Sequence, residues 1–220
     1  MSNVADAFTS VLAMLLCLTF HEAAHAYVAR LFGDRTAEFQ GRLSLNPFVH
    51  ADPLGTIILP AIGALFHMPI LGWAKPVPVD SRNLRNPRRD YMLVAIAGPA
   101  SNLLLAGIFI FFLNLYEVRF SDVISQSHFL YPLVKLLGTA VYINVFLAVF
   151  NLIPLPPLDG ATVLMWFLPD HWARKYQEVV APYGFFILLF LLMGGGLAWI
   201  KPVAMTYVSV VYSLTSRILG

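Results

Sequence analysis

Charged residues are scarce in this sequence. Of its 220 residues only 12% are Asp, Glu, Lys or Arg, against roughly 25% in an ordinary soluble domain, and 59% are hydrophobic. The net charge of +2 is too small to indicate nucleic-acid binding. With a single cysteine, Cys17, an internal disulfide is excluded. The N-terminus also lacks the basic residues of a cleaved signal peptide, so we expect the first apolar stretch to remain as a membrane helix.

What the sequence does have is a series of long apolar runs. A membrane-spanning helix needs about 20 mostly apolar residues. The runs are Ala7–Thr19, Leu54–Leu71, Tyr91–Tyr116, Tyr131–Leu155, Val179–Ile200 and Val203–Val211. They predict an all-α polytopic membrane protein that lies almost wholly in or against the lipid bilayer. We expect one domain over residues 1–220, with a core at about 7–168 and one or two C-terminal membrane helices at about 179–219.

Polar residues follow directly on the first run. His21 and His25 are four apart, so on a helix they share one face with about 5–6 Å between their Cβ atoms. With Glu22 they form the His-Glu-x-x-His pattern, in which two imidazoles bind zinc and the glutamate acts on a metal-bound water. Ionisable residues inside a membrane are costly and usually functional. The alternative is that these three polar residues only join helices to one another by hydrogen bonds. Gly33-Asp34 predicts the end of this helix.

Asp159 is the candidate for a third ligand, because a catalytic zinc site needs three protein ligands and one open position. It follows the proline-rich stretch Pro154–Pro157, which cannot continue a regular helix. Broken backbone at membrane depth is tolerated only where protein or a cavity covers it, and a carboxylate there suits a metal. Two alternatives stay open. Asp159 N-caps the helix that follows, or His50 and Asp52 supply the ligands; His50 otherwise lines the entrance to the site.

Together these motifs resemble those of the site-2 proteases, a family of intramembrane zinc metalloproteases. The resemblance extends from about Thr19 to Leu164. The matching segments are His21–His25, Gly72–Asp80, Gly98–Asn102 and Asn151–Gly160. It implies that His21, His25 and Asp159 bind one Zn²⁺ per chain and that Glu22 is catalytic.

Further site residues follow from the same resemblance. We expect Asn102 to assist catalysis by donating a hydrogen bond to the substrate carbonyl or oxyanion; a helix-packing amide is the alternative. Asn151 either contacts the substrate or hydrogen-bonds the backbone where the helix is interrupted. The segment Ile70–Asp80 is expected to form a short β-hairpin whose edge adds the substrate as another strand, since Pro76 and Pro78 remove donors from one edge. A simple connecting hairpin is the alternative. The predicted substrate-binding residues there are Gly72, Trp73, Ala74, Lys75, Pro76 and Val77.

The positive charges predict the topology. Lys and Arg near membrane helices favour the cytoplasm, and eight of the 14 lie between Arg30 and Arg89. All eight share one side if Leu54–Leu71 is a re-entrant segment, and they split between the sides if it crosses the membrane. We expect the re-entrant form, with the N-terminus outside and the zinc site nearer the cytoplasmic face. A full crossing is the main alternative.

The resemblance implies a three-helix catalytic core that hydrolyses peptide bonds within or near transmembrane segments of single-pass membrane proteins. The chain is expected to be a minimal member, because no PDZ-like insertion fits between Tyr116 and Tyr131 and no nucleotide-sensing domain follows. Two other functions are a membrane metal transporter and a catalytically silent scaffold that binds transmembrane helices. A transporter often shows inverted repeats, which are not visible, and a scaffold needs no general base such as Glu22.

Overall fold

The computed structural model describes residues 2–59, 72–120 and 129–219, and within these ranges the chain is all helical. The α-helices are α1 (Ser2–Leu31), α2 (Thr36–Phe39), α3 (Pro47–His50), α5 (Pro87–Phe120), α6 (Tyr131–Asn151), α7 (Asp159–Phe167), α8 (Asp170–Val179), α9 (Gly184–Met193) and α10 (Ile200–Leu219). Shorter turns are the π-helical η1 (Pro53–Ile58) and the 3-10 turns η2 (Ser81–Asn83) and η4 (Ala181–Tyr183).

Within the described residues, four helical stretches are long and apolar enough to cross a membrane. They are Val4–Leu31, Pro87–Phe120, Tyr131–Asn151 and Asp170–Met193. They confirm the predicted all-helical, multi-pass membrane protein. Of the predicted segment Leu54–Leu71, residues 60–71 lie outside the described part of the chain. The last of the four stretches ends at Met193, immediately before Gly194.

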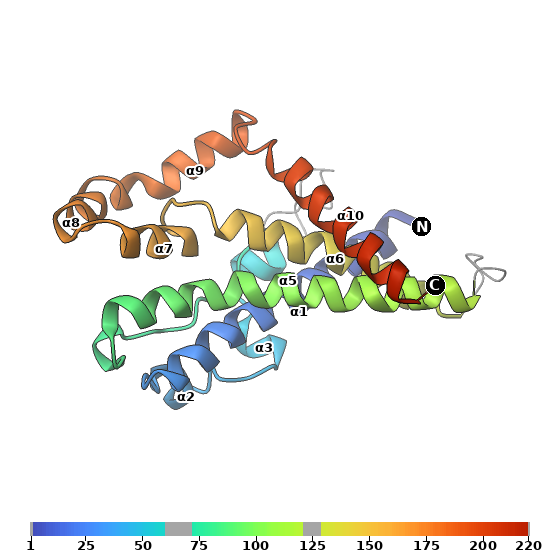
Figure 1. Cartoon of the computed structure of the whole chain (residues 1–220), viewed down its shortest axis with the longest axis horizontal. Helices are drawn as coiled ribbons and strands as arrows, with labels where there is room; N and C mark the ends of the chain where they lie inside the picture. The colour runs from blue at the N-terminus through green and yellow to red at the C-terminus, as the bar shows by residue number, and fades with distance from the viewer. Residues whose placement is uncertain (1, 60–71, 121–128, 220) are drawn as a thin grey trace.

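The centre of the molecule is formed by α1, α5 and α6, which pack against one another (Figure 1). Small side chains line one of their contacts: Ala13 and Cys17 on α1 and Ala140 on α6 form one buried cluster. Small residues let membrane helices approach closely, so that packing and polar contacts hold them together. Helix α7 packs on α5, α10 lies across α5 and α6, and both ends of the chain lie at the same end of the molecule.

Helix α1 ends where the sequence predicts. Gly33 has φ +113°, the Gly33 N–H donates to the Arg30 carbonyl at 3.1 Å, and the Asp34 N–H donates to the Ala29 carbonyl at 2.9 Å. This is the glycine-terminated C-cap that satisfies the last helical carbonyls. The buried Asp34 carboxylate then accepts the Asp80 N–H at 2.8 Å, so the end of α1 holds the end of the 72–80 loop.

Of the predicted β-hairpin at 70–80, residues 70 and 71 lie outside the described part of the chain. For the rest the prediction is wrong: Gly72–Asp80 contains no strand. Its N–H groups donate to separate elements rather than to a partner strand. Trp73 donates to the Gly55 carbonyl at 3.3 Å and Lys75 to the His50 carbonyl at 2.9 Å. The N–H groups of alternate residues face one edge of an extended chain, and the prolines at 76 and 78 leave the opposite edge poor in donors.

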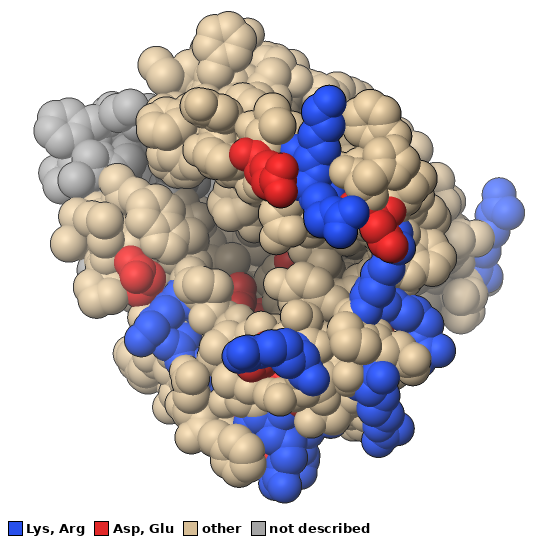
Figure 2. All heavy atoms as spheres, turned by 90° about the vertical axis from the view of Figure 1, so that its left-hand side faces the viewer, with Lys and Arg blue, Asp and Glu red and all other residues tan. Residues whose placement is uncertain are grey.

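Positive charge gathers at one end of the molecule. Lys and Arg side chains surround a hollow at the end where α5 begins and α8 lies, and acidic side chains are visible inside it (Figure 2). Arg88 and Arg89 at the start of α5 and Arg174 and Lys175 on α8 are exposed there. Basic segments that are far apart in the sequence therefore lie at the same end.

Candidate metal centre

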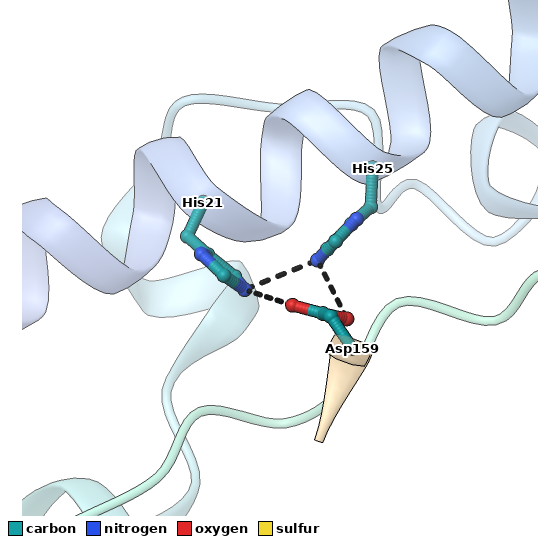
Figure 3. Close-up of side chains that lie close together, drawn as sticks. All are labelled: His21, His25 and Asp159. Carbon is teal, nitrogen blue, oxygen red and sulfur yellow. Dashed lines mark hydrogen bonds and ion pairs between the residues drawn. The ribbon is translucent and has the colours of Figure 1, made fainter. Parts of the chain in front are cut away.

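Two imidazoles and one carboxylate converge inside the bundle (Figure 3). His21 and His25 lie one turn apart on α1, with their Nε2 atoms 3.1 Å apart. Asp159, the first residue of α7, places Oδ2 at 3.2 Å from His21 Nε2 and Oδ1 at 3.5 Å from His25 Nε2. The ligand atoms of the three residues all lie within 4.8 Å of one another. Both imidazoles are buried, and Asp159 is partly buried.

The other nitrogen of each imidazole is hydrogen-bonded to an oxygen. His21 Nδ1 lies 2.6 Å from Asn102 Oδ1, and His25 Nδ1 lies 2.7 Å from the Val94 carbonyl oxygen. An oxygen of this kind only accepts, so each Nδ1 carries the proton and donates it. In the neutral ring each Nε2 is therefore left with a lone pair facing Asp159. Contacts of this kind fix the orientation of metal-binding histidines.

The three residues fit a divalent metal ion. Two Nε2 lone pairs and a carboxylate face one another across a few ångströms, an arrangement that repels unless a cation lies between them. Asp159 Oδ2 is buried and has no hydrogen-bond partner among the described residues. Imidazole nitrogen and carboxylate oxygen are both zinc ligands in proteins. Within the described ranges, these are the only His, Cys, Asp or Glu side chains grouped closely enough to hold a metal.

Asp159 does not cap α7, so that alternative is wrong. The N-cap residue is Leu158, and no side chain makes a capping hydrogen bond there. The start of α7 lies directly against the end of α6. A Cβ atom on Gly160 would be 2.3 Å from the Leu152 carbonyl oxygen and 2.4 Å from that of Ile153. Glycine at 160 therefore permits the close approach that carries Asp159 to the imidazoles.

A second glycine, on α5, leaves space for the two imidazole rings. A Cβ atom on Gly98 of α5 would be 2.4 Å from His25 Nε2 and 2.6 Å from His21 Cε1. Real Cβ atoms do not approach this closely, so only glycine fits here without moving the rings. In the sequence Gly98 is the start of the Gly98–Asn102 segment; the structure shows that it packs against the two histidines.

Asn102 is fully buried and lies behind His21, with its carboxamide oxygen toward Nδ1. Its Nδ2 donates to the Cys17 carbonyl at 3.3 Å and to Asn144 Oδ1 at 2.6 Å. The contacts of its side chain are thus made with α1 and α6. Asn151, at the end of α6, donates from Nδ2 to the Leu147 carbonyl of its own helix at 3.0 Å.

Glu22 contacts the 72–80 loop. Its Oε2 accepts the Val77 N–H at 2.8 Å, and its side chain is half-buried. The loop is held at its start as well, where Thr56 Oγ1 donates to the Trp73 carbonyl at 2.9 Å. Trp73 packs so closely over Gly55 that a Cβ atom there would be 2.6 Å from the indole ring. The loop predicted to bind substrate and the glutamate predicted to be catalytic are therefore in direct contact.

His50 and Asp52 lie outside this group of ligands. His50 is buried and donates from Nε2 to the Ser44 carbonyl at 2.8 Å. Asp52 Oδ1 accepts the Leu54 N–H at 3.0 Å and the Gly55 N–H at 2.7 Å, as the N-cap of η1. Their side chains are thus used to build the short helical turns before the 72–80 loop.

Two residues that sequence reasoning missed support the site from α5 and α6. Arg88 at the start of α5 donates from Nη2 to the Trp166 carbonyl at 3.0 Å and also to the Leu168 carbonyl, and so holds the C-terminal end of α7. Asn144 contacts Asn102 from α6. The signal for Asn144 was present in the sequence, since it is a polar residue within a run of apolar ones. In the sequence, Arg88 was counted only among the positive charges that predict the topology.

Comparisons with known proteins agree with this geometry. The profile of "Peptidase family M50" matches residues 9–191. The chain is 41% identical over 181 residues to the "Putative zinc metalloprotease YwhC" of Bacillus subtilis (strain 168), covering 82% of this chain and 78% of that protein.

Mycobacterial relatives are more distant. Identity to the "Putative zinc metalloprotease Rip2" of Mycobacterium tuberculosis (strain ATCC 25618 / H37Rv) is 32% over 196 residues, covering 86% of this chain and 67% of that protein. Identity to the protein of the same name in Mycolicibacterium smegmatis is 31% over 183 residues, covering 81% and 64%. No solved structure matches the chain.

Proposed function

The chain belongs to peptidase family M50 and is a zinc metalloprotease of that family, and from this premise we propose that it acts within the membrane. Its proposed reaction is the hydrolysis of peptide bonds within or next to the transmembrane segments of single-pass membrane proteins. The observation that carries this proposal is the position of the three ligand atoms, within 4.8 Å of one another on helices packed into a bundle of membrane-spanning length.

His21, His25 and Asp159 are the proposed ligands of one Zn²⁺ per chain. A catalytic zinc, when bound, lowers the pKa of its water and polarises the carbonyl to be attacked. Three protein ligands leave a position open for water and substrate. The hollow at the basic end of the molecule supports access of water to the site (Figure 2).

Glu22 is the proposed general base. It follows His21 directly, so the backbone that carries the first imidazole also carries this carboxylate. Its carboxylate takes a proton from the attacking water and later delivers it to the leaving amine. The hydrogen bond from the Val77 N–H holds the carboxylate against the 72–80 loop.

The loop from Gly72 to Val77 is proposed to bind the substrate as an extended chain. A transmembrane helix must be unwound before it is cut, because its peptide groups are hydrogen-bonded within the helix. Trp73, Lys75 and Val77 direct their N–H groups into the protein. In an extended chain the opposite edge would carry the carbonyls of residues 74, 76 and 78 and one N–H, on Ala74, because prolines stand at 76 and 78. This edge suits a substrate that mainly donates hydrogen bonds to it. Asn151 stays a proposed contact of the substrate chain.

The proposed topology has the N-terminus outside and the metal centre nearer the cytoplasm. It is supported by the basic side chains at one end of the molecule and by both chain ends at the other (Figures 1 and 2). Positive residues are retained on the cytoplasmic side of short loops. The bond to be cut is then expected in the cytoplasmic half of the substrate helix.

The test uses full-length protein reconstituted in lipid nanodiscs with a panel of single-pass membrane proteins. We expect cleavage that a zinc chelator abolishes, with cut sites that mass spectrometry places inside or beside the transmembrane segment. Glu22→Gln should retain zinc and bind substrate without cutting it. Cleavage that persists in Glu22→Gln or after zinc removal would contradict the proposal. Zinc uptake into vesicles by Glu22→Gln would instead favour a transporter.

A further inference from the structure

A chain of buried amides links the metal centre to α6. His21, Asn102 and Asn144 come from α1, α5 and α6, and the side chains of both asparagines are fully buried. The two hydrogen bonds that join the three residues are both 2.6 Å long. An asparagine within a membrane helix costs free energy unless its donors and acceptors are satisfied. Two such residues behind one zinc ligand therefore need an explanation.

The direction of each hydrogen bond is set by main-chain carbonyls, which only accept. Asn144 Nδ2 lies 2.9 Å from the Ala140 carbonyl, so the NH₂ group of Asn144 faces that carbonyl and its Oδ1 faces Asn102. Asn102 must then present its own NH₂ group to Asn144 and to the Cys17 carbonyl, 3.3 Å away. Its Oδ1 is left pointing at His21. The orientation of both amides is thus determined without reference to the histidine.

The orientation of Asn102 decides which nitrogen of His21 carries the proton. With Oδ1 toward the ring, Nδ1 is the donor and Nε2 keeps its lone pair for a metal. With the amide turned over, its NH₂ group would face Nδ1, the ring proton would move to Nε2, and His21 would no longer offer a lone pair toward Asp159. A flip of this kind exchanges two groups of nearly equal size, so packing alone does not prevent it.

We propose that Asn144 is a positioning residue of the metal centre: by accepting a hydrogen bond from Asn102 Nδ2, it holds the Asn102 oxygen toward His21 and keeps His21 in its metal-binding tautomer. This inference rests on the proposed zinc site. It assigns α6, which supplies none of the three ligands, a direct part in metal binding. It also gives a role to the buried polar residue at position 144, which lies between the buried Ala140 and Ala148.

The test measures zinc and Co²⁺ affinity of the purified full-length protein by competition with a chelator, and the Co²⁺ absorption spectrum. Asn144→Leu removes the acceptor, and we expect zinc affinity to fall about tenfold, at the lower end of the effect of outer contacts on metal sites, because the Cys17 carbonyl remains. Asn144→Asp, protonated in this buried position, keeps both hydrogen bonds and should restore the affinity.

Asn114 supplies a matched control. It is also a buried asparagine in a membrane helix, and its Nδ2 donates to the Tyr212 carbonyl of α10 at 3.1 Å, far from the metal centre in the fold. Asn114→Leu should lower the melting temperature as Asn144→Leu does, while zinc affinity and the Co²⁺ spectrum stay unchanged. Equal zinc affinities of Asn144→Leu and Asn114→Leu would overturn the proposal.

A second background separates orientation from packing. In Asn102→Leu no amide is left to orient, so adding Asn144→Leu should cause no further loss of zinc affinity. The same tenfold loss in both backgrounds would show that Asn144 acts through packing only. Histidine ¹⁵N shifts of the metal-free protein give a direct readout: Asn144→Leu should move the His21 proton partly from Nδ1 to Nε2, and unchanged shifts would refute the idea. Failure of the wild-type chain to bind zinc would overturn the proposed function as well.

Discussion

The helices that surround the metal centre and helix α9 are built differently. Around the metal centre, α1, α5 and α6 are joined by buried polar contacts, and two glycines lie where any larger side chain would collide. In α9, by contrast, only Gly184 and Leu188 are buried, and large apolar side chains such as Phe186 and Phe190 are exposed. Both regions are apolar in sequence, and they differ in how many polar groups are fixed between helices.

This difference indicates a division of roles. Apolar side chains gain little from helix association inside lipid, whereas interhelical hydrogen bonds and close small-residue contacts give it specificity. A region rich in such contacts holds ligands in fixed positions, as a catalytic metal requires. A helix that faces outward with apolar side chains is suited to contact with lipid. We therefore expect substitutions near the metal centre to change metal binding or rate, and matched substitutions in α8 and α9 to leave both unchanged.

The largest contrast is expected between two glutamates. Glu22→Gln should lower kcat by about 10²–10⁴, the usual contribution of general acid–base catalysis, while zinc content stays at the wild-type value. Glu178→Gln makes the same chemical change on the exposed α8 and should leave kcat within twofold. Single-turnover cleavage of a fluorogenic membrane substrate measures both. A comparable loss in both variants would remove the distinction between the two regions.

The next contrast is between two glycines. Gly98→Ala places a Cβ atom within 2.6 Å of both imidazole rings and should lower zinc affinity by about 10–100-fold, as misplaced ligands do. A Cβ atom on Gly138 of α6 would meet nothing within 4 Å, so Gly138→Ala should keep zinc affinity and raise stability by about 0.4–1 kcal/mol. Chelator competition and thermal melting test the pair. Retained zinc affinity in Gly98→Ala would contradict the geometry of the site.

A smaller effect is expected from Arg88, which holds the C-terminal end of α7 by hydrogen bonds. Arg88→Gln loses the hydrogen bonds to the Trp166 and Leu168 carbonyls, and with them part of the restraint on the helix that begins at Asp159. Because Arg88 is about half exposed, we expect a net loss of only about 0.5–1.5 kcal/mol, or a few-fold lower zinc affinity. Arg174→Gln on α8 is the control and should have no effect. Equal zinc affinities of Arg88→Gln and Arg174→Gln would show that the position of α7 does not depend on the hydrogen bonds of Arg88.

The smallest effect is expected on the outer face of α9. Phe190 is 75% exposed, so Phe190→Leu should leave zinc affinity, cleavage rate and melting temperature unchanged in lipid nanodiscs. This result would support the difference between α9 and the helices around the metal centre, because it would show that α9 tolerates changes to its large side chains. A loss of cleavage with zinc retained would instead indicate that α9 contacts the substrate helix.

Most of the fold and the family could be predicted from the sequence. The apolar runs predicted an all-helical membrane protein, and the match to peptidase family M50 confirms the resemblance carried by segments such as His21–His25 and Asn151–Gly160. Spacing along one helix brings His21 and His25 together, so that pair follows from local geometry. The meeting of Asp159 with both histidines depends on Gly98 and Gly160, whose contacts are with residues distant in the sequence.

The sequence was less informative where structure depends on single long-range hydrogen bonds. Alternating prolines and valines at 76–79 suggested a hairpin, but the N–H groups of this loop bond to three different elements, which no local pattern specifies. Asn102 was expected to face the substrate; the structure directs its oxygen to His21, and its role in catalysis stays a proposal. Asn144 was overlooked because a lone asparagine carries no motif, and only its contact with Asn102 gives it meaning.

The most direct test of the account is the zinc content of the purified full-length protein, measured together with zinc X-ray absorption. We predict one zinc per chain with nitrogen and oxygen neighbours only, two of them imidazoles, and loss of that zinc in Asp159→Ala. Zinc that stays bound with an unchanged spectrum in Asp159→Ala, or a spectrum that shows a sulfur neighbour, would contradict the assignment of His21, His25 and Asp159 as its ligands.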